Sequence, residues 1–196
     1  MDEAEARELS LFDQAIMFAT KAHTGITRKG STVPYIVHPL EVAAIAATIT
    51  TDEEILAAAV LHDVLEDTDT TPEELGIVFG PRILCLVRDE TEDKRRELPP
   101  EVTWRQRKEE TIRFLREEAS WEAKVLALSD KLSNMRAVYR DMQQVGDKLW
   151  ERFHQKDRNM HAWMYRSVLE ALSDLDQYIV WQEYRWLVEA AFGKDT

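Results

Sequence analysis

The sequence predicts a single all-α domain with short connections between its helices. Apolar residues recur at helical spacing along most of the chain, and no stretch combines alternating polarity with a hairpin turn. The chain shows no internal repeat and no linker that would divide it into two domains. Its 196 residues, of which 44% are hydrophobic, are enough to bury one substantial core.

Helix start and stop signals set the order of the elements. Thr51 or Asp52 is placed to cap one helix. Thr71 followed by Pro72 begins another, and Ser120 caps a long one. We expect helices over about residues 9–23, 39–50, 53 onwards, 72–79, 81–87, 104–118 and 121–139, further helices within 148–192, and loops at 24–33 and 89–103, the second exposed and mobile.

The bulk composition limits the classes of partner. A net charge of −12 argues against binding duplex DNA or an anionic membrane through the overall field. The single cysteine, Cys85, lies in an apolar run and rules out an internal disulfide, which fits a reducing cytoplasm. The N-terminus carries no signal-peptide pattern, and no apolar run is long enough to cross a bilayer. We therefore expect a cytoplasmic protein.

Segment 61–67, Leu-His-Asp-Val-Leu-Glu-Asp, is the most informative part of the chain. If the preceding helix continues through it, His62 and Glu66 lie one turn apart. The same spacing joins Asp63 to Asp67. Four polar groups would then crowd the end of an apolar segment, and burying them is costly unless a metal or hydrogen bonds compensate. A metal-assisted hydrolase is therefore the first hypothesis.

Two further residues, His38 and Asp130, complete a candidate metal site. His38 precedes a proline at a helix entrance, and Asp130 interrupts an apolar helix face. With His62 and Asp63 they offer two imidazoles and two carboxylates, which suit a divalent ion with open positions for water. Each also has a structural alternative: a cap or packing role for His38, a surface location for the 62–63 pair, and an ion pair for Asp130. The combination is more specific than its parts, because all four occur at breaks in apolar helices.

Cations near this site offer candidate phosphate contacts. Arg28 and Lys29 are adjacent in a glycine-containing loop, where they could grip phosphates or stack on a base. Simple solvation is the alternative, and it is the usual fate of surface charges. Arg107 and Lys108 form a second, weaker candidate set.

Four segments carry the motifs of a known family in the same order. They are residues 23–30 with Arg-Lys-Gly, 34–43 with Pro-Tyr-Ile-x-His-Pro-Leu, 58–68 with Leu-His-Asp-Val-x-Glu-Asp-Thr, and 128–136, Leu-Ser-Asp-Lys-Leu-Ser-Asn-Met-Arg. This set resembles the HD-domain alarmone hydrolases, most closely the small stand-alone members related to the RelA/SpoT hydrolase domain, including the animal-type enzyme. The resemblance covers about residues 10–175 of a single domain over 1–196 and leaves a helical extension over about 176–196. It implies a single-domain helical bundle of the HD-domain phosphohydrolase type.

The resemblance also implies an activity and a set of roles. The activity is a Mn²⁺-dependent 3′-pyrophosphohydrolase acting on (p)ppGpp, the alarmone of the stringent response, with GDP or GTP and pyrophosphate as products. The metal ligands would be His38, His62, Asp63 and Asp130, and Glu66 and Asp67 would orient and activate the attacking water. Substrate contacts would come from Arg28, Lys29 and Asn134. Tyr165 would add a late aromatic contact in a loose register, for which His161 is the alternative.

The chain departs from the family pattern at two places. Ser133 stands where the long enzymes have histidine, and Ser129 and Lys131 flank Asp130 where many members have alanine and arginine. Residues 31–33 replace a Gly-Glu type of turn, which leaves the base preference open.

Other functions stay open from the sequence. The same chemistry could act on (p)ppApp, or on pyrophosphorylated tRNA as an antitoxin paired with a small alarmone synthetase. A different HD phosphohydrolase would act on ordinary nucleotides, and a non-catalytic regulator would only bind an alarmone. The sequence does not determine whether the chain forms a homo-oligomer.

Overall fold

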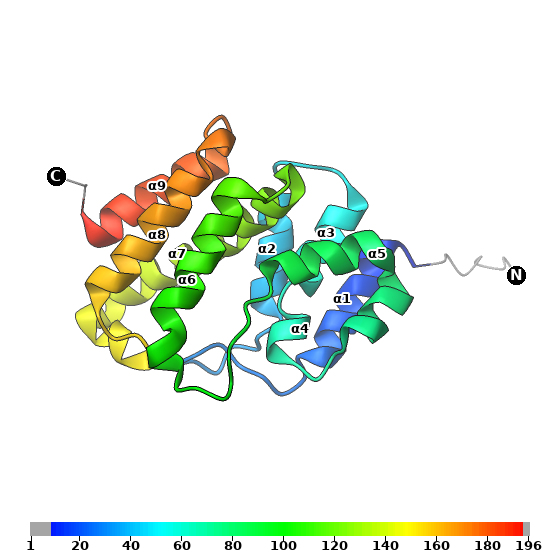
Figure 1. Cartoon of the computed structure of the whole chain (residues 1–196), viewed down its shortest axis with the longest axis horizontal. Coiled ribbons are helices and arrows are strands. Elements are labelled where there is room, and N and C mark those ends of the chain that lie inside the picture. Colours follow the sequence, from blue (N-terminus) through cyan, green and yellow to red (C-terminus); the bar gives the residue numbers. More distant parts are fainter. Residues whose placement is uncertain (1–8, 194–196) are drawn as a thin grey trace, which may run out of the picture.

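The computed structural model describes residues 9–193, which form helices joined by short connections (Figure 1). This confirms the all-α prediction for the described residues, where the β pairing is an isolated bridge between Thr27 and Pro34. The outer limits of the expected domain, residues 1 and 196, lie outside the described part. The elements are α1 (Leu11–Ala22), α2 (Val37–Ala46), α3 (Glu53–Leu61), α4 (Val64–Asp67), α5 (Pro72–Glu90), α6 (Pro100–Glu117), α7 (Trp121–Val145), the 3-10 helix η1 (Gly146–Arg152), α8 (Arg158–Ala171), the 3-10 helix η2 (Ser173–Leu175) and α9 (Ile179–Phe192).

Capping residues fix several of these starts. Ser10 forms a capping box with Asp13, so α1 begins at Leu11 and leaves Leu9 outside the helix and exposed. Of the two predicted caps of α3, Thr51 and Asp52, the structure uses Asp52. Ser120 caps α7 through a hydrogen bond from the backbone of Ala123.

The helix before the His-Asp motif does not continue through it. α3 ends at Leu61, and His62 and Asp63 form a turn before the short helix α4. The ring of His62 bonds back to the carbonyl of Ala59 at 2.8 Å, and this side-chain bond competes with helix continuation. The predicted one-turn pairing of His62 with Glu66 is therefore wrong, and the break sets Asp63 beside the His62 ring instead.

The predicted break at Gly80 is confirmed, because this glycine takes φ 82° ahead of Pro81 and kinks α5. Two other boundaries differ from expectation. α6 begins at Pro100 rather than at Trp104, since a proline is well suited to the first helical turn. α7 runs on to Val145, beyond the expected end near residue 139.

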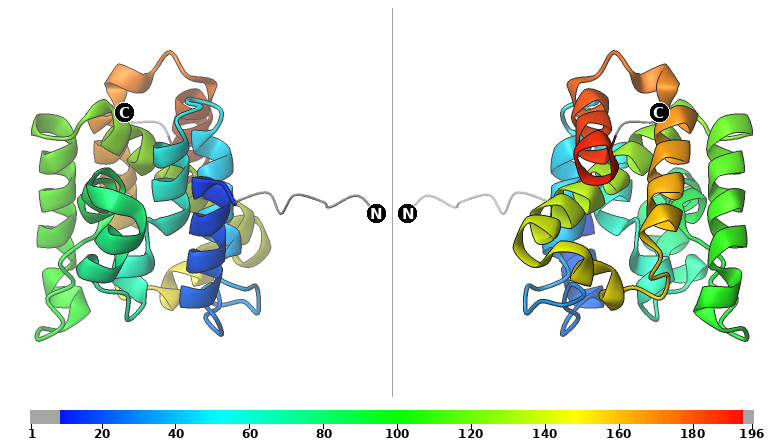
Figure 2. Two further views of the ribbon diagram at one scale, coloured as in Figure 1. Left: turned by 90° about the vertical axis from the view of Figure 1, so that its right-hand side faces the viewer. Right: turned by 90° about the vertical axis from the view of Figure 1, so that its left-hand side faces the viewer.

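α7 is the central helix between two hydrophobic clusters. Its Val125 and Leu126 join the cluster built by α1, α2, α3 and α5, while Leu128 and Leu132 join the cluster built with α6, α8 and α9. Figure 1 shows α1–α5 on one side of the molecule and α6–α9 on the other, and Figure 2 shows α8 and α9 side by side. Polar residues of α7 that face α2 are therefore enclosed by packed helices.

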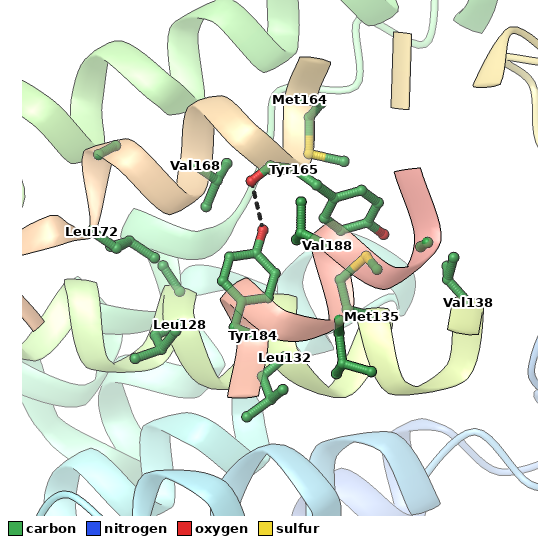
Figure 3. Close-up of a cluster of buried hydrophobic side chains, with 14 of the residues drawn as sticks. Leu128, Leu132, Met135, Val138, Met164, Tyr165, Val168, Leu172, Tyr184 and Val188 are labelled. Atoms are coloured by element: carbon green, nitrogen blue, oxygen red, sulfur yellow. Dashed lines mark hydrogen bonds between the residues drawn. The ribbon is translucent and has the colours of Figure 1, made fainter. Parts of the chain in front are cut away.

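The C-terminal helix is an integral part of this packing. Tyr184 of α9 is fully buried and donates a hydrogen bond to the Tyr165 carbonyl of α8 at 3.0 Å (Figure 3). Val188 of α9 and Met135 of α7 lie in the same cluster. α9 thus packs against α7, the helix that also contacts α2.

Among the described residues, the helices are too short or too polar to cross a lipid bilayer.

Candidate metal centre

The structure brings together side chains from three separate helical regions. Donor atoms of His38, His62 and Asp130 all lie within 4.8 Å of one another, and all three residues are buried. His38 lies in the first turn of α2, His62 follows the end of α3, and Asp130 lies in the middle of α7. Asp63 faces the same point, with Oδ2 3.0 Å from Nε2 of His62 and 3.6 Å from Nε2 of His38.

The separations suit ligands that share one ion. Oδ1 of Asp130 lies 3.0 Å from Nε2 of His38 and 3.7 Å from Nε2 of His62. Ligand atoms about 2.1 Å from one ion and at right angles would be roughly 3 Å apart. The four side chains present two nitrogen and two oxygen donors, a mixture that borderline divalent ions accept.

The hydrogen bonds at the far side of each ring set its tautomer. Nδ1 of His62 donates to the Ala59 carbonyl, and Nδ1 of His38 contacts Oγ of Ser133 at 2.8 Å. Each neutral ring then presents a bare Nε2 to a carboxylate, which is an unfavourable pairing of two acceptors. Nε2 of His62 is indeed buried without a hydrogen-bond partner. A cation held between the rings and the carboxylates would satisfy all of these atoms.

Electrostatics at the centre point the same way. Burial raises the cost of ionising Asp63 and Asp130, yet the nearby cationic and imidazole groups hold the pKa of both carboxyls below their usual range. Burial opposes a charge on His62, yet Asp63 and Asp130 raise the pKa of its ring well above the ordinary value. Two ionised carboxylates at this buried position therefore create a strong demand for positive charge.

Glu66 and Asp67 lie at the edge of this centre on α4. Nζ of Lys94 lies 3.2 Å from Oε1 of Glu66 and contacts Oδ1 of Asp67. The hydroxyl of Tyr35 lies 2.6 Å from Oδ2 of Asp63 and 3.1 Å from Oδ2 of Asp67. Burial raises the pKa of Glu66, which makes this carboxylate more basic. The two acids are thus held side by side next to the candidate ligands.

Asn134 connects the basic loop to the centre. Its Nδ2 donates to Oδ1 of Asp130 at 2.7 Å, and its Oδ1 accepts from Arg28 at 3.2 Å. The Arg28 guanidinium also lies 5.8 Å from the centre of the Tyr35 ring. Lys29 is exposed to solvent in the same loop. Of the two predicted loop cations, Arg28 therefore has direct contacts with the site.

Arg107 and Lys108 are engaged in a different way. Both bind the carboxylate of Glu92, whose backbone N–H donates to Oε2 of Glu66 at 3.1 Å. The side chain of Glu92 is only 13% exposed, so the expectation of a wholly exposed loop over 89–103 is wrong here. These cations buttress the loop that covers Glu66, and their contact with a phosphate stays a prediction.

Two late residues were predicted as alternatives for substrate contact. Tyr165 is buried on α8, and this burial raises the pKa of its hydroxyl to about 12. His161 stacks on Trp150 with ring centres 4.7 Å apart, and its Nε2 donates to the Gln155 carbonyl at 2.8 Å. A contact of either residue with the substrate stays a prediction.

Sequence reasoning did not assign a role to Tyr35 or Lys94. Tyr35 lies within a quoted motif, three residues before His38, which was a usable signal. Lys94 lies in the charged segment 89–103, where nothing in the sequence shows which cation turns back over Glu66. A pocket of about 340 Å³ adjoins this place and is lined by Glu66, Lys94 and their neighbours in the loop.

The fold and the clustered side chains define a class, namely an all-α protein with a buried histidine and carboxylate centre able to hold a divalent metal. The family model described as HD domain matches residues 15–157. The chain therefore belongs to the HD domain family.

Curated relatives include animal and bacterial proteins. The guanosine-3′,5′-bis(diphosphate) 3′-pyrophosphohydrolase MESH1 of Danio rerio is 39% identical over 130 residues, which are 65% of this chain and 68% of the relative. The same enzyme of Drosophila melanogaster is 37% identical over 64% of this chain and 68% of the relative. The GTP pyrophosphokinase rsh of Brucella ovis is 38% identical over 66% of this chain, but the match spans only 17% of that protein's length.

Solved structures share the fold over most of the chain. One, described as a metazoan ortholog of SpoT that hydrolyses ppGpp, has a TM-score of 0.77 and 28% identity and covers 95% of this chain and 98% of its own. A crystal structure from Listeria monocytogenes EGD-e has a TM-score of 0.70 and 30% identity and covers 82% of this chain and 97% of its own.

Proposed function

We propose that this protein is a metal-dependent hydrolase that removes the 3′-pyrophosphate of (p)ppGpp, leaving GDP or GTP and releasing pyrophosphate. The observation that carries the proposal is the meeting of His38, His62 and Asp130 within 4.8 Å. The similarity to MESH1 proteins, named for this reaction, supports the same substrate for this chain.

The donor set fits a divalent ion, and we assign Mn²⁺ to it. His38, His62, Asp63 and Asp130 would hold the ion through two nitrogen and two oxygen donors. When bound, such an ion lowers the pKa of coordinated water and neutralises phosphate charge. Two observations support this assignment. Unprotonated Nε2 atoms face carboxylate oxygens, and Nε2 of His62 is buried without a hydrogen-bond partner.

Glu66 and Asp67 supply the proton chemistry in this proposal. Both point to the edge of the centre and share Lys94, which orients them. One of them accepts the proton of the attacking water as the water oxygen bonds to phosphorus. The bond from that phosphorus to the ribose 3′ oxygen breaks, and the carboxyl returns the proton to this oxygen, which leaves as the 3′ hydroxyl. The raised pKa of Glu66 keeps this carboxylate basic enough for the task.

Arg28 and Lys29 bind the nucleotide in this scheme. Arg28 is fixed by Asn134 and lies over Tyr35, which leaves the rest of its guanidinium free to meet phosphate or base. Lys29 adds an exposed charge from the same loop, and Tyr165 contributes a hydroxyl from α8. These cations give a strongly acidic protein a local site for an anionic substrate.

Comparison of three substrates tests the proposal. Pyrophosphate release would be measured from ppGpp, from ppApp and from pyrophosphorylated tRNA, each with Mn²⁺, for the wild type and for Asp130→Asn. We expect release from ppGpp with the wild type and a loss of that release in the variant. Preferred release from ppApp or tRNA would instead assign the adenine or antitoxin alternative, and ppGpp binding without turnover would assign a non-catalytic regulator.

The cellular setting is part of the proposal. We infer a cytoplasmic enzyme, because a nucleotide substrate and a single unpaired cysteine fit that compartment. A cognate small alarmone synthetase and a homo-oligomer stay predictions from the sequence.

A further inference from the structure

We infer that Ser133 and Glu41 are positioning residues that set the tautomer of His38 and thereby the affinity of the centre for its metal ion. This inference rests on the metal site of the proposed function. Neither residue faces the shared point of the four candidate ligands. Both act through the far side of the His38 ring, where the sequence indicated no role for them.

A chain of short contacts joins the three residues. Nδ1 of His38 lies 2.8 Å from Oγ of Ser133, and that hydroxyl donates to Oε2 of Glu41 at 2.8 Å. His38 is 3% exposed and Ser133 is fully buried, so water has little access to the bond between them. The contacts connect the first turn of α2 to the middle of α7.

The direction of these bonds follows from the number of protons. A serine hydroxyl carries one proton, and in this arrangement it is given to the Glu41 carboxylate, which can only accept. Oγ of Ser133 must then accept from Nδ1–H of His38. The neutral ring is thereby fixed with its lone pair on Nε2, the atom that faces Asp130 and the candidate ion.

The competing tautomer would block metal binding. With its proton on Nε2, His38 would donate directly to Oδ1 of Asp130, 3.0 Å away. That hydrogen bond would occupy one nitrogen and one oxygen donor of the proposed site. Ser133 and Glu41 favour the other tautomer and so reduce the free energy needed to open the site to an ion.

Glu41 is itself held in place by Arg136, which in turn pairs with a carboxylate of α9. Arg136 of α7 donates to Oε1 of Glu41 at 3.1 Å and forms a two-pronged pair with Glu183 of α9 at 2.7 Å. A planar guanidinium with two such partners fixes the orientation of both carboxylates. Oε2 of Glu41 is therefore left to accept from Ser133. The arrangement leads from α9 through α7 to the His38 ring.

Mn²⁺ affinity of single variants tests this inference. Free Mn²⁺ would be counted by electron paramagnetic resonance in titrations of the wild type, Ser133→Ala and Glu41→Gln. We expect Ser133→Ala to weaken Mn²⁺ binding roughly 10- to 100-fold and Glu41→Gln to weaken it less, because glutamine still accepts a hydrogen bond. Ser129→Ala is the matched control, since that buried hydroxyl of the same helix bonds only to the Val125 carbonyl.

The outcomes separate the two proposals. Wild-type binding that is matched by Ser133→Ala and Glu41→Gln would overturn the role of these residues and leave the metal site intact. A wild type that binds no Mn²⁺ would overturn both the site and the inference. If Ser133→Ala does not fold, Glu41→Gln decides, because the Glu41 side chain is 38% exposed and tolerates substitution. An equal loss of affinity in Ser129→Ala would show a general packing effect and would also overturn the inference.

Discussion

The hydroxyl of Tyr35 lies 2.6 Å from Oδ2 of Asp63 and is partly buried just before α2. The same oxygen lies 3.1 Å from Oδ2 of Asp67, so one phenol connects a candidate metal ligand with a candidate base. Burial and the two carboxylates raise the pKa of Tyr35 above its ordinary value. The hydroxyl therefore stays protonated and donates to this pair of acids.

Replacing Tyr35 should impair turnover more than folding. Tyr35→Phe removes the hydroxyl that orients Asp63 and Asp67, and a hydrogen bond to a charged group contributes about 1.5–3 kcal/mol. We expect kcat to fall roughly 10-fold or more, as each 1.4 kcal/mol is about a factor of ten. Tyr139→Phe is the control, because that ring packs on Trp186 away from the centre. Equal kcat values for Tyr35→Phe and wild type would contradict the role.

Asp67 should be required for turnover and dispensable for the fold. The residue lies at the end of α4 with a side chain that is 30% exposed, so truncation leaves no large cavity. We expect Asp67→Ala to lose roughly 10²- to 10⁴-fold in kcat, the usual contribution of a general base. The helical circular dichroism spectrum of Asp67→Ala should match that of the wild type. The control is Asp69→Ala at an exposed neighbouring position, which should keep both the spectrum and the activity. An Asp67→Ala variant with the full rate would refute the role.

Arg28 should affect substrate binding more than chemistry. Its contacts with Asn134 and the Tyr35 ring hold the guanidinium at the site without touching the candidate ligands directly. We expect Arg28→Ala to raise KM for ppGpp roughly 10-fold and to change kcat far less. The reason is that the lost contact would hold the substrate equally in the ground state and the transition state. Arg88→Ala, at an exposed position on α5, should leave both constants as they are. A fall in kcat at constant KM would assign Arg28 to the chemical step instead.

Glu90 should make the metal-free protein sensitive to pH. Burial raises the pKa of this carboxyl to about 7 from an ordinary 4.5, while Lys131 opposes the shift and Asp130 adds to it. The folded protein therefore holds the Glu90 proton more tightly than the unfolded chain does. This difference stabilises the fold fully below about pH 4.5, and the stabilisation is lost as the pH rises through about 7.

Glu90→Gln should remove this dependence. We expect the variant to match the wild type near pH 4.5 and to exceed its free energy of unfolding above pH 7, by on the order of 3 kcal/mol, because glutamine stays neutral. Urea unfolding with a chelator present would measure the difference. Parallel stability profiles of the two proteins across this range would show that Glu90 is not the group responsible.

Local patterns predicted the elements better than the junctions between them. The caps at Asp52 and Ser120 and the break at Gly80 could be read from the chain, because each depends on neighbouring residues alone. The turn at His62 and Asp63 could not, since it depends on a side-chain bond to Ala59 and on packing against α7. Periodicity alone would have continued the helix through this motif.

The candidate site shows the same division. The spacing of His38, His62 and Asp130 in broken apolar helices indicated a shared centre, and the structure brings these three together. Lys94 was hidden in a charged loop, because the sequence does not show which long side chain turns inward. Ser133 looked like a simple substitution until its bonds to His38 and Glu41 were seen in three dimensions.

Anomalous diffraction at the manganese edge tests the central claim most directly. Crystals grown with Mn²⁺ should show one strong peak bounded by Nε2 of His38, Nε2 of His62 and the carboxylates of Asp63 and Asp130. Crystals of Asp130→Ala grown alike should show that peak weakened or lost. A wild-type map without density at this position, or with the ion bound elsewhere on the protein, would contradict the account.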